Sequence, residues 1–535
     1  MSDRRLSIWG WGYEDQQPTL DQRKATAQAI AASLNRSDVE LDPEPKVEEL
    51  ELRAPRLVPP ASLAAICSSS TYDRAAHSYG KAMPDLIRAY RRQFPNPPDV
   101  VAFPRTEADI VSLLDWCSSV NAFAIPFGGG SSVTGGVEPP ADGSQRASVS
   151  IDLRYLNKVL EIDRTSRAAR IQAGVYGPAL EDQLRPHGYT LRHYPQSFEV
   201  SSLGGWIATR SGGHFASLYT HIDDFVESLR VVTPRGTLES RRLPGSGAGP
   251  SPDRMFIGSE GILGIITEAW MRLQDRPVYR ASAGVRFEKF ASAVTAVRIM
   301  SQSGLYPTNC RLLDPMEVKR NKVGDGTGTM VMLGFESADH PLDAWMNRAL
   351  ECCRDHGGAT PNGVIIKGGG ETAGREGSVG DWRDAFIRMP YQSISMAAMG
   401  AIFDTVESSI TWERFDAFYA GVMDATRKAL DDICGGGILS CRFTHIYPDG
   451  PAPYFTFLGL GKRGGELEQW KALKSAACDV VIRLGGTITH HHSVGRIHRP
   501  WYDKQRPDLF AAALRAAKSA LDPQGMLNPG VLIDP

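Results

Sequence analysis

The sequence lacks the features that mark membrane-spanning, secreted or nucleic-acid-binding proteins. It contains no run of about 18 apolar residues, so no membrane span is expected. The formal net charge is −2 at pH 7, without the basic excess of a nucleic-acid binder. The first residues, M-S-D-R-R-L-S, contain no apolar stretch of the kind that directs secretion. These absences favour a cytoplasmic protein, and peripheral contact with a membrane stays open.

The eight cysteines are scattered, and no two of them form a C-x-x-C pair. This distribution predicts a reducing compartment and argues against a disulfide framework or a cysteine-bound zinc ion. The cysteines are Cys67, Cys117, Cys310, Cys352, Cys353, Cys434, Cys441 and Cys478.

A chain of 535 residues is too long for a single hydrophobic core, so two or three domains are expected. Residues 1–95 combine helical patches with an acidic, proline-containing stretch, D-V-E-L-D-P-E-P-K-V-E-E-L-E-L. We interpret this segment as an extended lead that wraps another domain.

A helix, a strand and a glycine-rich loop are predicted in that order from residue 106 to residue 132. Thr106 and Asp109 have the spacing of a capping box at the start of the helix. The run from Ala122 to Phe127 then predicts a short strand that leads into P-F-G-G-G-S-S. A Rossmann site needs strand, glycine loop and helix, but further strand-like runs follow here, so this stretch is not a Rossmann site. The predicted helical face is Ile110, Leu113, Leu114 and Cys117, and the strand-like runs are Val149–Leu153, Val159–Ile162 and Ala169–Gln172.

The glycine loop predicts a site for an anion. Lacking Cβ atoms, Gly128 to Gly130 can adopt positive φ and turn successive N–H groups into one concavity, and Ser131 and Ser132 add hydroxyl donors. Taken alone, such a loop is as typical of a flexible surface turn. Two further stretches rich in small residues, Gln196–Gly213 and Phe256–Thr267, favour the anion site. In the second, glycines interrupt an apolar strand. Together the three segments could line one slot for a large anionic cofactor.

With these three segments, the sequence resembles the vanillyl-alcohol-oxidase superfamily of flavoproteins and, within it, the alkyldihydroxyacetonephosphate (alkylglycerone-phosphate) synthases. The resemblance runs nearly end to end, and its P-x-G-G-G-[ST]-S and S-E-G-x-L-G-I-I-T motifs are specific for the FAD-binding domain when they occur together. The other matching stretches are W-G-W-G-Y at Trp9, P-D-V-V-A-F-P at Pro98, C-R-F-T at Cys441, T-H-H-H-S-V-G at Thr489 and L-D-P-Q-G-M-L-N-P-G at Leu521.

The resemblance implies an α+β fold, in which a two-part FAD-binding domain carries an α/β cap over the flavin. The expected division is a lead at 1–95, the FAD-binding domain at 96–275, the cap or substrate domain at 276–485 and a return to the FAD-binding domain at 486–535. It also implies a homodimer and one FAD without a covalent link, although His214 is a formal attachment point. The implied FAD-binding residues are Pro126, Phe127, Gly128, Gly129, Gly130, Ser131, Ser132, Gln196, Ser197, Ser201, Ser202, Thr209, Arg210, Ser211, Gly212, Glu260, Gly261, Gly264, Ile265 and Ile266.

Catalysis is expected from a tyrosine and three histidines. Tyr454 falls on the family's catalytic tyrosine, its proton donor and acceptor, although an aromatic packed in the cap core is the structural alternative. His490, His491 and His492 follow an apolar run and are predicted to end a strand, with His491 on the opposite face from the other two. The resemblance implies substrate binding and proton transfer for them. Histidines bonded to backbone carbonyls are the alternative. No additional ligand cluster stands out, so no metal site is expected.

Two positions depart from the family pattern. Ser393 stands where the synthases have a substrate-binding arginine, and Arg388, five residues earlier, is the candidate replacement. Ser493 stands where the family usually has glycine. The substrate is expected to be a small or lipid-like molecule.

Three functions stay open. The first is exchange of the acyl chain of acyl-dihydroxyacetone phosphate for a fatty alcohol, with flavin N5 as the covalent trap. The second, favoured by the missing arginine, is an FAD-dependent oxidase or dehydrogenase of a hydroxy acid or alcohol. The third is a flavin-binding assembly protein without catalysis, against which the retained tyrosine and histidines argue.

Overall fold

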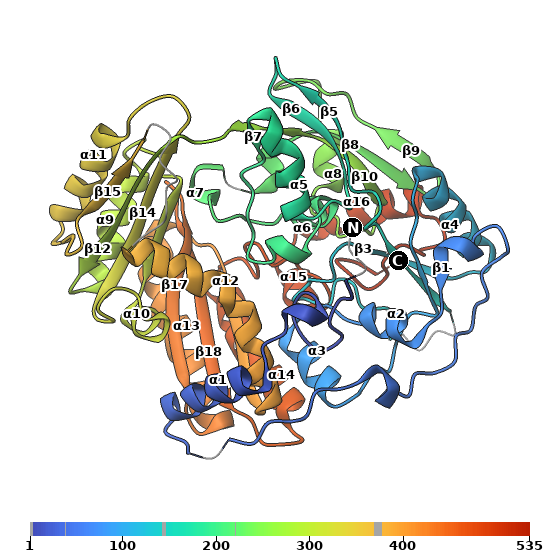
Figure 1. Cartoon of the computed structure of the whole chain (residues 1–535), viewed down its shortest axis with the longest axis horizontal. Helices are drawn as coiled ribbons and strands as arrows, with labels where there is room; N and C mark the ends of the chain where they lie inside the picture. The colour runs from blue at the N-terminus through green and yellow to red at the C-terminus, as the bar shows by residue number, and fades with distance from the viewer. Residues whose placement is uncertain (1–3, 38, 142–145, 220, 369–376, 535) are drawn as a thin grey trace.

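The computed structural model describes residues 4–37, 39–141, 146–219, 221–368 and 377–534, without the side chains of residues 216, 219, 377–385, 387 and 388. The chain forms an α+β fold with two smaller sheets on one side and one large sheet on the other (Figure 1). The long connections between these parts bring the N-terminal and C-terminal segments across both of them.

The glycine-rich part of the chain is built on two sheets and a two-stranded pairing. In the four-stranded sheet, of order β1-β2-β4-β3, the strands β2, β4 and β3 run parallel, whereas the five-stranded sheet, of order β5-β6-β10-β8-β9, is antiparallel. The strands are β1 (Cys67–Ser68), β2 (Val100–Ala102), β3 (Phe123–Phe127), β4 (Ser148–Asp152), β5 (Val159–Asp163), β6 (Ala168–Gln172), β8 (Val226–Thr233), β9 (Gly236–Glu239) and β10 (Ile265–Arg272), with β7 (Tyr189–Thr190) paired to β11 (Gln274–Asp275).

The large sheet has seven antiparallel strands in the order β15-β12-β14-β13-β17-β18-β16. Its strands are β12 (Tyr279–Phe287), β13 (Asn309–Leu313), β14 (Thr329–Ser337), β15 (Val364–Lys367), β16 (Ala401–Glu407), β17 (Ile438–Ile446) and β18 (Pro451–Leu460). Several strands of this sheet are buried along almost their whole length because helices pack on it.

Helices from distant parts of the chain cover each part of the molecule, since α1 packs against α12 beside the large sheet and α16 packs on the core of the five-stranded sheet. The helices that precede the large sheet in the chain are α1 (Leu20–Ser33), α2 (Thr71–Ala76), α3 (Met83–Tyr90), α4 (Glu107–Ser119), α5 (Gly177–Leu184), α6 (Leu203–Thr209), α7 (Ala216–Tyr219) and α8 (Pro252–Phe256). Those that follow are α9 (Phe290–Ser301), α10 (Pro315–Asn321), α11 (Asp343–Arg354), α12 (Gly377–Ala398), α13 (Trp412–Cys434), α14 (Glu466–Arg483), α15 (Arg499–Gln505) and α16 (Asp508–Leu521).

The local predictions around the glycine loop are confirmed. Thr106 caps α4 with the capping box formed by Asp109, and the predicted apolar face of this helix is buried. β3 ends at Phe127, directly before the loop. The expected apolar strand at Phe256–Thr267 is wrong for its first half: α8 ends at Phe256, a turn follows, and β10 begins only at Ile265.

Both chain ends cross from one part of the fold to the other. Trp9 and Leu86 of the N-terminal segment belong to the same hydrophobic core as Phe455 of the large sheet. At the other end, Leu527 packs in the core of the four-stranded sheet and forms a parallel bridge with Ala124 of β3. The smaller sheets therefore depend on residues from the last part of the chain.

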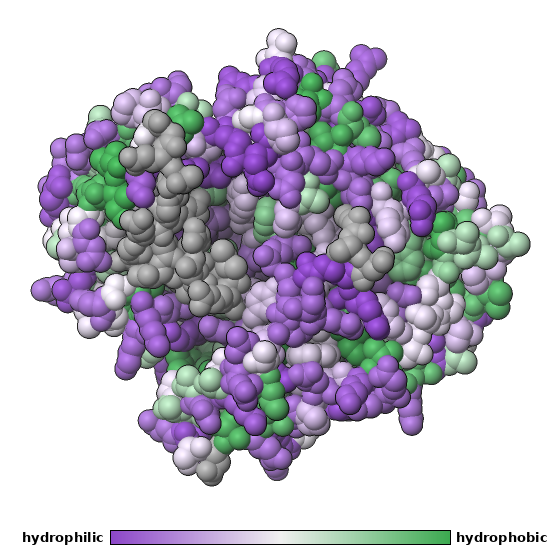
Figure 2. Space-filling model, viewed as in Figure 1, coloured by the Kyte–Doolittle hydropathy of each residue, from purple (hydrophilic) through white to green (hydrophobic). Residues whose placement is uncertain are grey.

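The visible face of the molecule carries mostly hydrophilic residues, among which hydrophobic ones are dispersed (Figure 2). Within the described part of the chain, no helix combines the length and the apolar character needed to cross a membrane.

Candidate active site

A single cavity of about 260 Å³ lies between the glycine loop and the large sheet. Gly128 to Ser132 form part of one wall, and Tyr454, His491 and His492 form part of the opposite wall. The glycine loop therefore faces the same space as three of the four residues predicted to act in catalysis, although more than 300 residues separate them in sequence. The fourth, His490, does not line the cavity.

The glycines of the loop are needed mainly for close packing. A Cβ atom on Gly129 would lie 1.8 Å from the carbonyl oxygen of Val200, and one on Gly128 would lie 2.3 Å from Oγ of Ser202. Of the three glycines only Gly130 has a positive φ, +68°. The positive φ that all three glycines could adopt is thus used only by Gly130, and Gly128 and Gly129 instead bring the loop against residues 200–202.

The predicted FAD-binding residues fall into two sets. Gly128–Ser132, Gln196, Ser197, Ser201, Ser202, Thr209, Ser211 and Gly212 line the cavity. Pro126, Phe127, Arg210, Glu260, Gly261, Gly264, Ile265 and Ile266 do not line it.

The residues of the second set, which do not line the cavity, pack against the loop and strands around it. A Cβ on Gly261 would meet Pro126 at 2.9 Å, and one on Gly264 would meet Val231 at 2.6 Å. Arg210 forms an ion pair with Asp223. These residues hold the loop and the strands in place, and their assignment to the cofactor stays a prediction.

Lys81 is a residue of this wall that the sequence did not single out. Its backbone N–H donates to Ser132 O at 2.6 Å, and its ammonium donates to Ser7 O at 2.8 Å. Burial lowers the pKa of Lys81 to about 8. Among the described residues that line the cavity, Lys81 is the charged side chain next to the glycine loop. The carboxylate in this lining, Asp404, belongs to the large sheet. Backbone N–H groups, hydroxyls and an ammonium fit a diphosphate.

Three residues of the opposite wall occupy neighbouring strands in register. Tyr454 on β18 lies opposite Glu407 of β16 on one side and opposite Arg442 of β17 on the other. Residues directly opposite in a sheet share a face, so all three side chains belong to the row that faces the histidines. Glu407 and Arg442 were not found from the sequence, because only strand pairing brings them to Tyr454.

Glu407 organises the histidine loop. Its carboxylate accepts the backbone N–H groups of His490, His491 and His492 at 3.1, 2.9 and 2.7 Å, and lies 2.5 Å from Nδ1 of His491. Burial acts to raise the pKa of Glu407, but His491 and His492 lower it well below its usual value. The carboxylate is therefore ionised at neutral pH.

The prediction that the three histidines end a strand is wrong. Residues 486–498 form a loop without regular structure, because three successive N–H groups point at one carboxylate, whereas a strand would alternate them between two sides. Burial lowers the pKa of His490 well below its usual value and that of His492 to about 3. Both imidazoles are neutral at pH 7.

Tyr454 lies under a guanidinium. The carbon of the Arg442 guanidinium is 4.1 Å from the centre of the Tyr454 ring, and Arg442 is itself paired with Glu317 at 3.3 Å. Burial raises the pKa of the Tyr454 phenol, and Arg442 partly offsets this rise. The rings of His491 and His492 lie 6.0 and 5.6 Å from the tyrosine ring. A neutral phenol, the neutral imidazole of His492 and a cation thus share one wall, the groups that proton transfer requires.

Sequence comparison agrees with this architecture. The family model "FAD binding domain" matches residues 98–240, and the model "FAD linked oxidases, C-terminal domain" matches residues 276–532. The alkyldihydroxyacetonephosphate synthase of Dictyostelium discoideum is 32% identical over 486 residues, which cover 86% of this chain and 77% of that protein. The chain belongs to the FAD-linked oxidases of the vanillyl-alcohol-oxidase type.

Two further relatives of this FAD-linked oxidase bear on its fold and chemistry. A D-lactate dehydrogenase (cytochrome) of Arabidopsis thaliana is 31% identical over 448 residues, covering 82% of this chain and 74% of that one. A solved structure of an alkyldihydroxyacetonephosphate synthase superposes with a TM-score of 0.79 at 26% identity and covers 98% of both chains. The FAD-binding domain indicates FAD as the cofactor, and the wall of backbone, hydroxyls and Lys81 fits it.

The two departures from the family pattern have structural contexts. Ser393 lines the cavity and donates its hydroxyl to Pro390 O at 2.6 Å, within α12. Arg388 lies in the same helix, but its side chain is outside the described residues. Ser493 takes φ +74°, a conformation that favours glycine, and its Oγ lies 2.9 Å from Oγ1 of Thr134.

Arg311 of this FAD-linked oxidase is a cation that the sequence did not reveal. It lies on β13, is 2% exposed and lines the cavity. Nε of Arg311 donates to Asn309 Oδ1 at 3.2 Å, and Nη2 lies 3.4 Å from His214 O. Burial lowers the pKa of Arg311 to about 9. No carboxylate among the described residues forms an ion pair with it.

Glu260 holds the far end of the histidine loop. Its two carboxylate oxygens accept the N–H groups of Val494 and Gly495, each at 2.8 Å. Burial raises the pKa of Glu260 to about 7. Residues 489–495 are thus held between two buried glutamates, Glu407 from the large sheet and Glu260 from the cofactor side.

Proposed function

We propose that this FAD-linked oxidase exchanges the acyl chain of an acyl-glycerone phosphate for a fatty alcohol. Arg311 carries the proposal. Its guanidinium is buried in the cavity that Tyr454 and His491 line, and no described carboxylate neutralises it. A buried cation of this kind requires an anion, and phosphate matches the donor geometry of a guanidinium.

The other lining residues support a substrate with an apolar chain. Large apolar side chains line the cavity together with the polar residues of the histidine wall. The apolar lining residues include Trp11, Met83, Leu86, Phe386 and Met389. An acyl or alkyl chain would lie against these residues, with its phosphate-bearing end at Arg311.

The residues have separate tasks in this proposal. Bound FAD supplies the electrophilic ring against which the substrate is held. Tyr454 keeps its proton at neutral pH, because burial raises the pKa of its phenol, and holds that proton at Oη for a substrate oxygen. Glu407 orients the ring of His491 through Nδ1, so that the imidazole accepts a proton from the substrate.

The test supplies the holoenzyme with acyl-dihydroxyacetone phosphate and a long-chain alcohol. We expect an ether-linked product and release of the fatty acid in equal amounts, with no net bleaching of the flavin. Arg311→Met should raise KM for the phosphate ester by about 10²-fold, equivalent to about 3 kcal/mol, while FAD content stays normal. Release of fatty acid without ether formation, or no reaction at all, would contradict the proposal.

A second candidate is a dehydrogenase of a 2-hydroxy acid, favoured by Ser393 and by the 31% identity to a D-lactate dehydrogenase. Arg311 would then bind a carboxylate. Anaerobic addition of D-2-hydroxy acids should bleach the flavin on this alternative and leave it unchanged on the first. Ser393→Arg should improve turnover of the phosphate ester only in a synthase-type enzyme.

We also propose that FAD is bound without a covalent link. Acid precipitation should therefore release all of the flavin into the supernatant, and flavin that stays with the precipitate would contradict this.

A further inference from the structure

One buried ring nitrogen beside the histidine loop has no hydrogen-bond partner. His445, at the end of β17, is 2% exposed, and its Nε2–H donates to Gly213 O at 3.1 Å. The Nδ1 atom of the same ring is buried and has no partner among the described residues. Buried polar atoms are nearly always paired, so this lone pair calls for a ligand.

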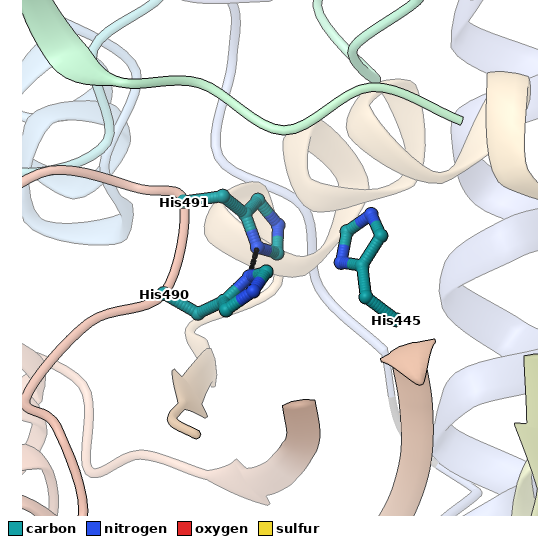
Figure 3. A group of neighbouring side chains, drawn as sticks. All are labelled: His445, His490 and His491. Atoms are coloured by element: carbon teal, nitrogen blue, oxygen red, sulfur yellow. Dashed lines mark hydrogen bonds between the residues drawn. The ribbon is translucent and has the colours of Figure 1, made fainter. Parts of the chain in front are cut away.

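Two other imidazoles converge on the same place. His445, His490 and His491 come from the large sheet and from the histidine loop, and their rings gather around a common space (Figure 3). One ring nitrogen from each lies within 4.8 Å of those from the other two. Nδ1 of His490 and Nδ1 of His491 are 3.0 Å apart. The register of β17 shifts between Phe443 and His445, and such irregularities redirect side chains at functional sites.

We propose that His445, His490 and His491 bind one divalent transition-metal ion of the Zn²⁺ class. Three imidazoles are ligands that Zn²⁺ prefers, with Zn–N distances of about 2.0–2.1 Å, so neighbouring ligand nitrogens lie about 3.3 Å apart. Nδ1 of His491 contacts Glu407, so His491 would bind the ion through Nε2. One nitrogen from each ring lies within 4.8 Å of those from the other two, so the three rings would have to draw closer around the ion.

Each of the three rings is already oriented by a second group. Gly213 O holds His445. The hydroxyl of Tyr447 lies 2.9 Å from Nε2 of His490, and the carboxylate of Glu407 contacts Nδ1 of His491. Outer partners of this kind fix ring orientation and tautomer in metal sites. Spacing in the sequence gave no sign of the site, because His445 precedes His490 by 45 positions and two of the partners, Gly213 and Glu407, come from further segments.

The ion would have one side toward the cavity. His445 and His491 both line the cavity. A Cβ on Gly212 would lie 3.3 Å from Cβ of His491 and 3.4 Å from Cε1 of His445, so glycine leaves these two rings room beside the cofactor segment. A three-histidine site with an open position binds and polarises an oxygen of a substrate. This inference rests on the histidine geometry. With the ion bound, His491 would hold the ion and would no longer accept the substrate proton, and the ion would polarise the substrate oxygen in either candidate reaction.

The test counts metal in the FAD-loaded protein. After treatment with a chelator, the holoenzyme is titrated with Zn²⁺ and separately with Co²⁺, followed by elemental analysis and visible absorption. We expect one ion per chain and cobalt bands of a nitrogen-rich site. His445→Gln should weaken binding at least about 10²-fold. His187→Gln, on the exposed surface, is the matched control and should bind as the wild type does.

Two outcomes would overturn the proposal. One is no retained Zn²⁺ or Co²⁺ at micromolar concentrations, which would make the three rings a metal-free hydrogen-bond network. The other is equal affinity in the wild type and in His445→Gln. Because His445→Gln could perturb folding, its FAD content and melting temperature are measured too, and Tyr447→Phe provides a milder variant expected to weaken binding. Metal content is read without turnover, so failure of the proposed reaction would not affect the result.

Discussion

The two walls of the cavity use different parts of the polypeptide. The cofactor wall presents backbone N–H groups and serine hydroxyls, with Lys81 as its charged member, while the wall of the large sheet presents buried ionisable side chains, most of them paired. The first wall depends on glycine, because a Cβ on Gly128 or Gly129 would overlap residues 200–202. The second wall depends on partners that keep each buried charge satisfied. Substitutions in the first wall should therefore reduce the binding of FAD, and substitutions in the second wall should reduce turnover.

Gly129→Val should have the largest effect, the loss of most bound FAD and with it all activity. The new Cβ would overlap Val200 O, so the loop must move away from the cofactor. The ratio of flavin to protein absorbance measures the effect. Gly247→Val is the control, since nothing lies within 4 Å of a Cβ there. Normal flavin content in Gly129→Val would show that the loop does not carry the cofactor.

Tyr454→Phe should lower turnover by about 10²- to 10⁴-fold, the typical cost of removing a general acid or base. FAD content and melting temperature should stay near wild type, because the ring remains under Arg442. Tyr155→Phe, a partly exposed tyrosine on the surface, serves as control. A wild-type rate in Tyr454→Phe on a confirmed substrate would reduce Tyr454 to a packing residue.

Glu407→Gln should destabilise the protein by about 3–5 kcal/mol, as expected when one member of a buried charged network is removed. The amide cannot accept all the N–H groups that the carboxylate accepts, so the histidine loop should loosen and turnover should fall. Denaturant titration measures the stability, and Glu288→Gln on the exposed surface should leave it unchanged. Equal stability of Glu407→Gln and wild type would contradict this role.

Glu260 should give the smallest effect, visible as a pH dependence of stability. Its folded-state pKa, about 7, lies above the ordinary value of 4.5, so the native state binds the proton more tightly than the unfolded state. Stability from this group is therefore complete below pH 4.5 and is lost as pH rises through 7, by up to about 3 kcal/mol. Denaturant titrations at pH 5 and 8 should show this decline in the wild type and a smaller one in Glu260→Gln. An equal loss of stability in the wild type and in Glu260→Gln would show that Glu260 does not cause the pH dependence.

The cofactor wall was largely predictable from the sequence, because its segments are contiguous. P-F-G-G-G-S-S and the Gln196–Gly212 stretch each carry their lining residues within one short run. What the sequence did not reveal was the reason for each glycine, since Gly129 depends on the distant Val200.

The catalytic wall was predictable only in part, because strand pairing creates it. Tyr454 and the histidines stood out in motifs, but strand register alone brings Glu407 beside Tyr454 and brings Arg442 and Arg311 to the cavity. The alternation predicted for the histidines failed for the same reason, since an acid 83 or more positions away in the sequence sets their backbone. Lys81 likewise depends on the path of the N-terminal segment.

The placement of residues 489–495 between Glu260 and Glu407 has a consequence for biosynthesis. Neither acid can be satisfied until this late segment has left the ribosome, and β3 then still waits for its bridge to Leu527. The large sheet can form first, with Glu407 exposed to water, whereas the smaller sheets and the histidine loop close together at the end of synthesis. A chain that stops short of residues 489–527 would therefore be without a working site as well as without a complete core.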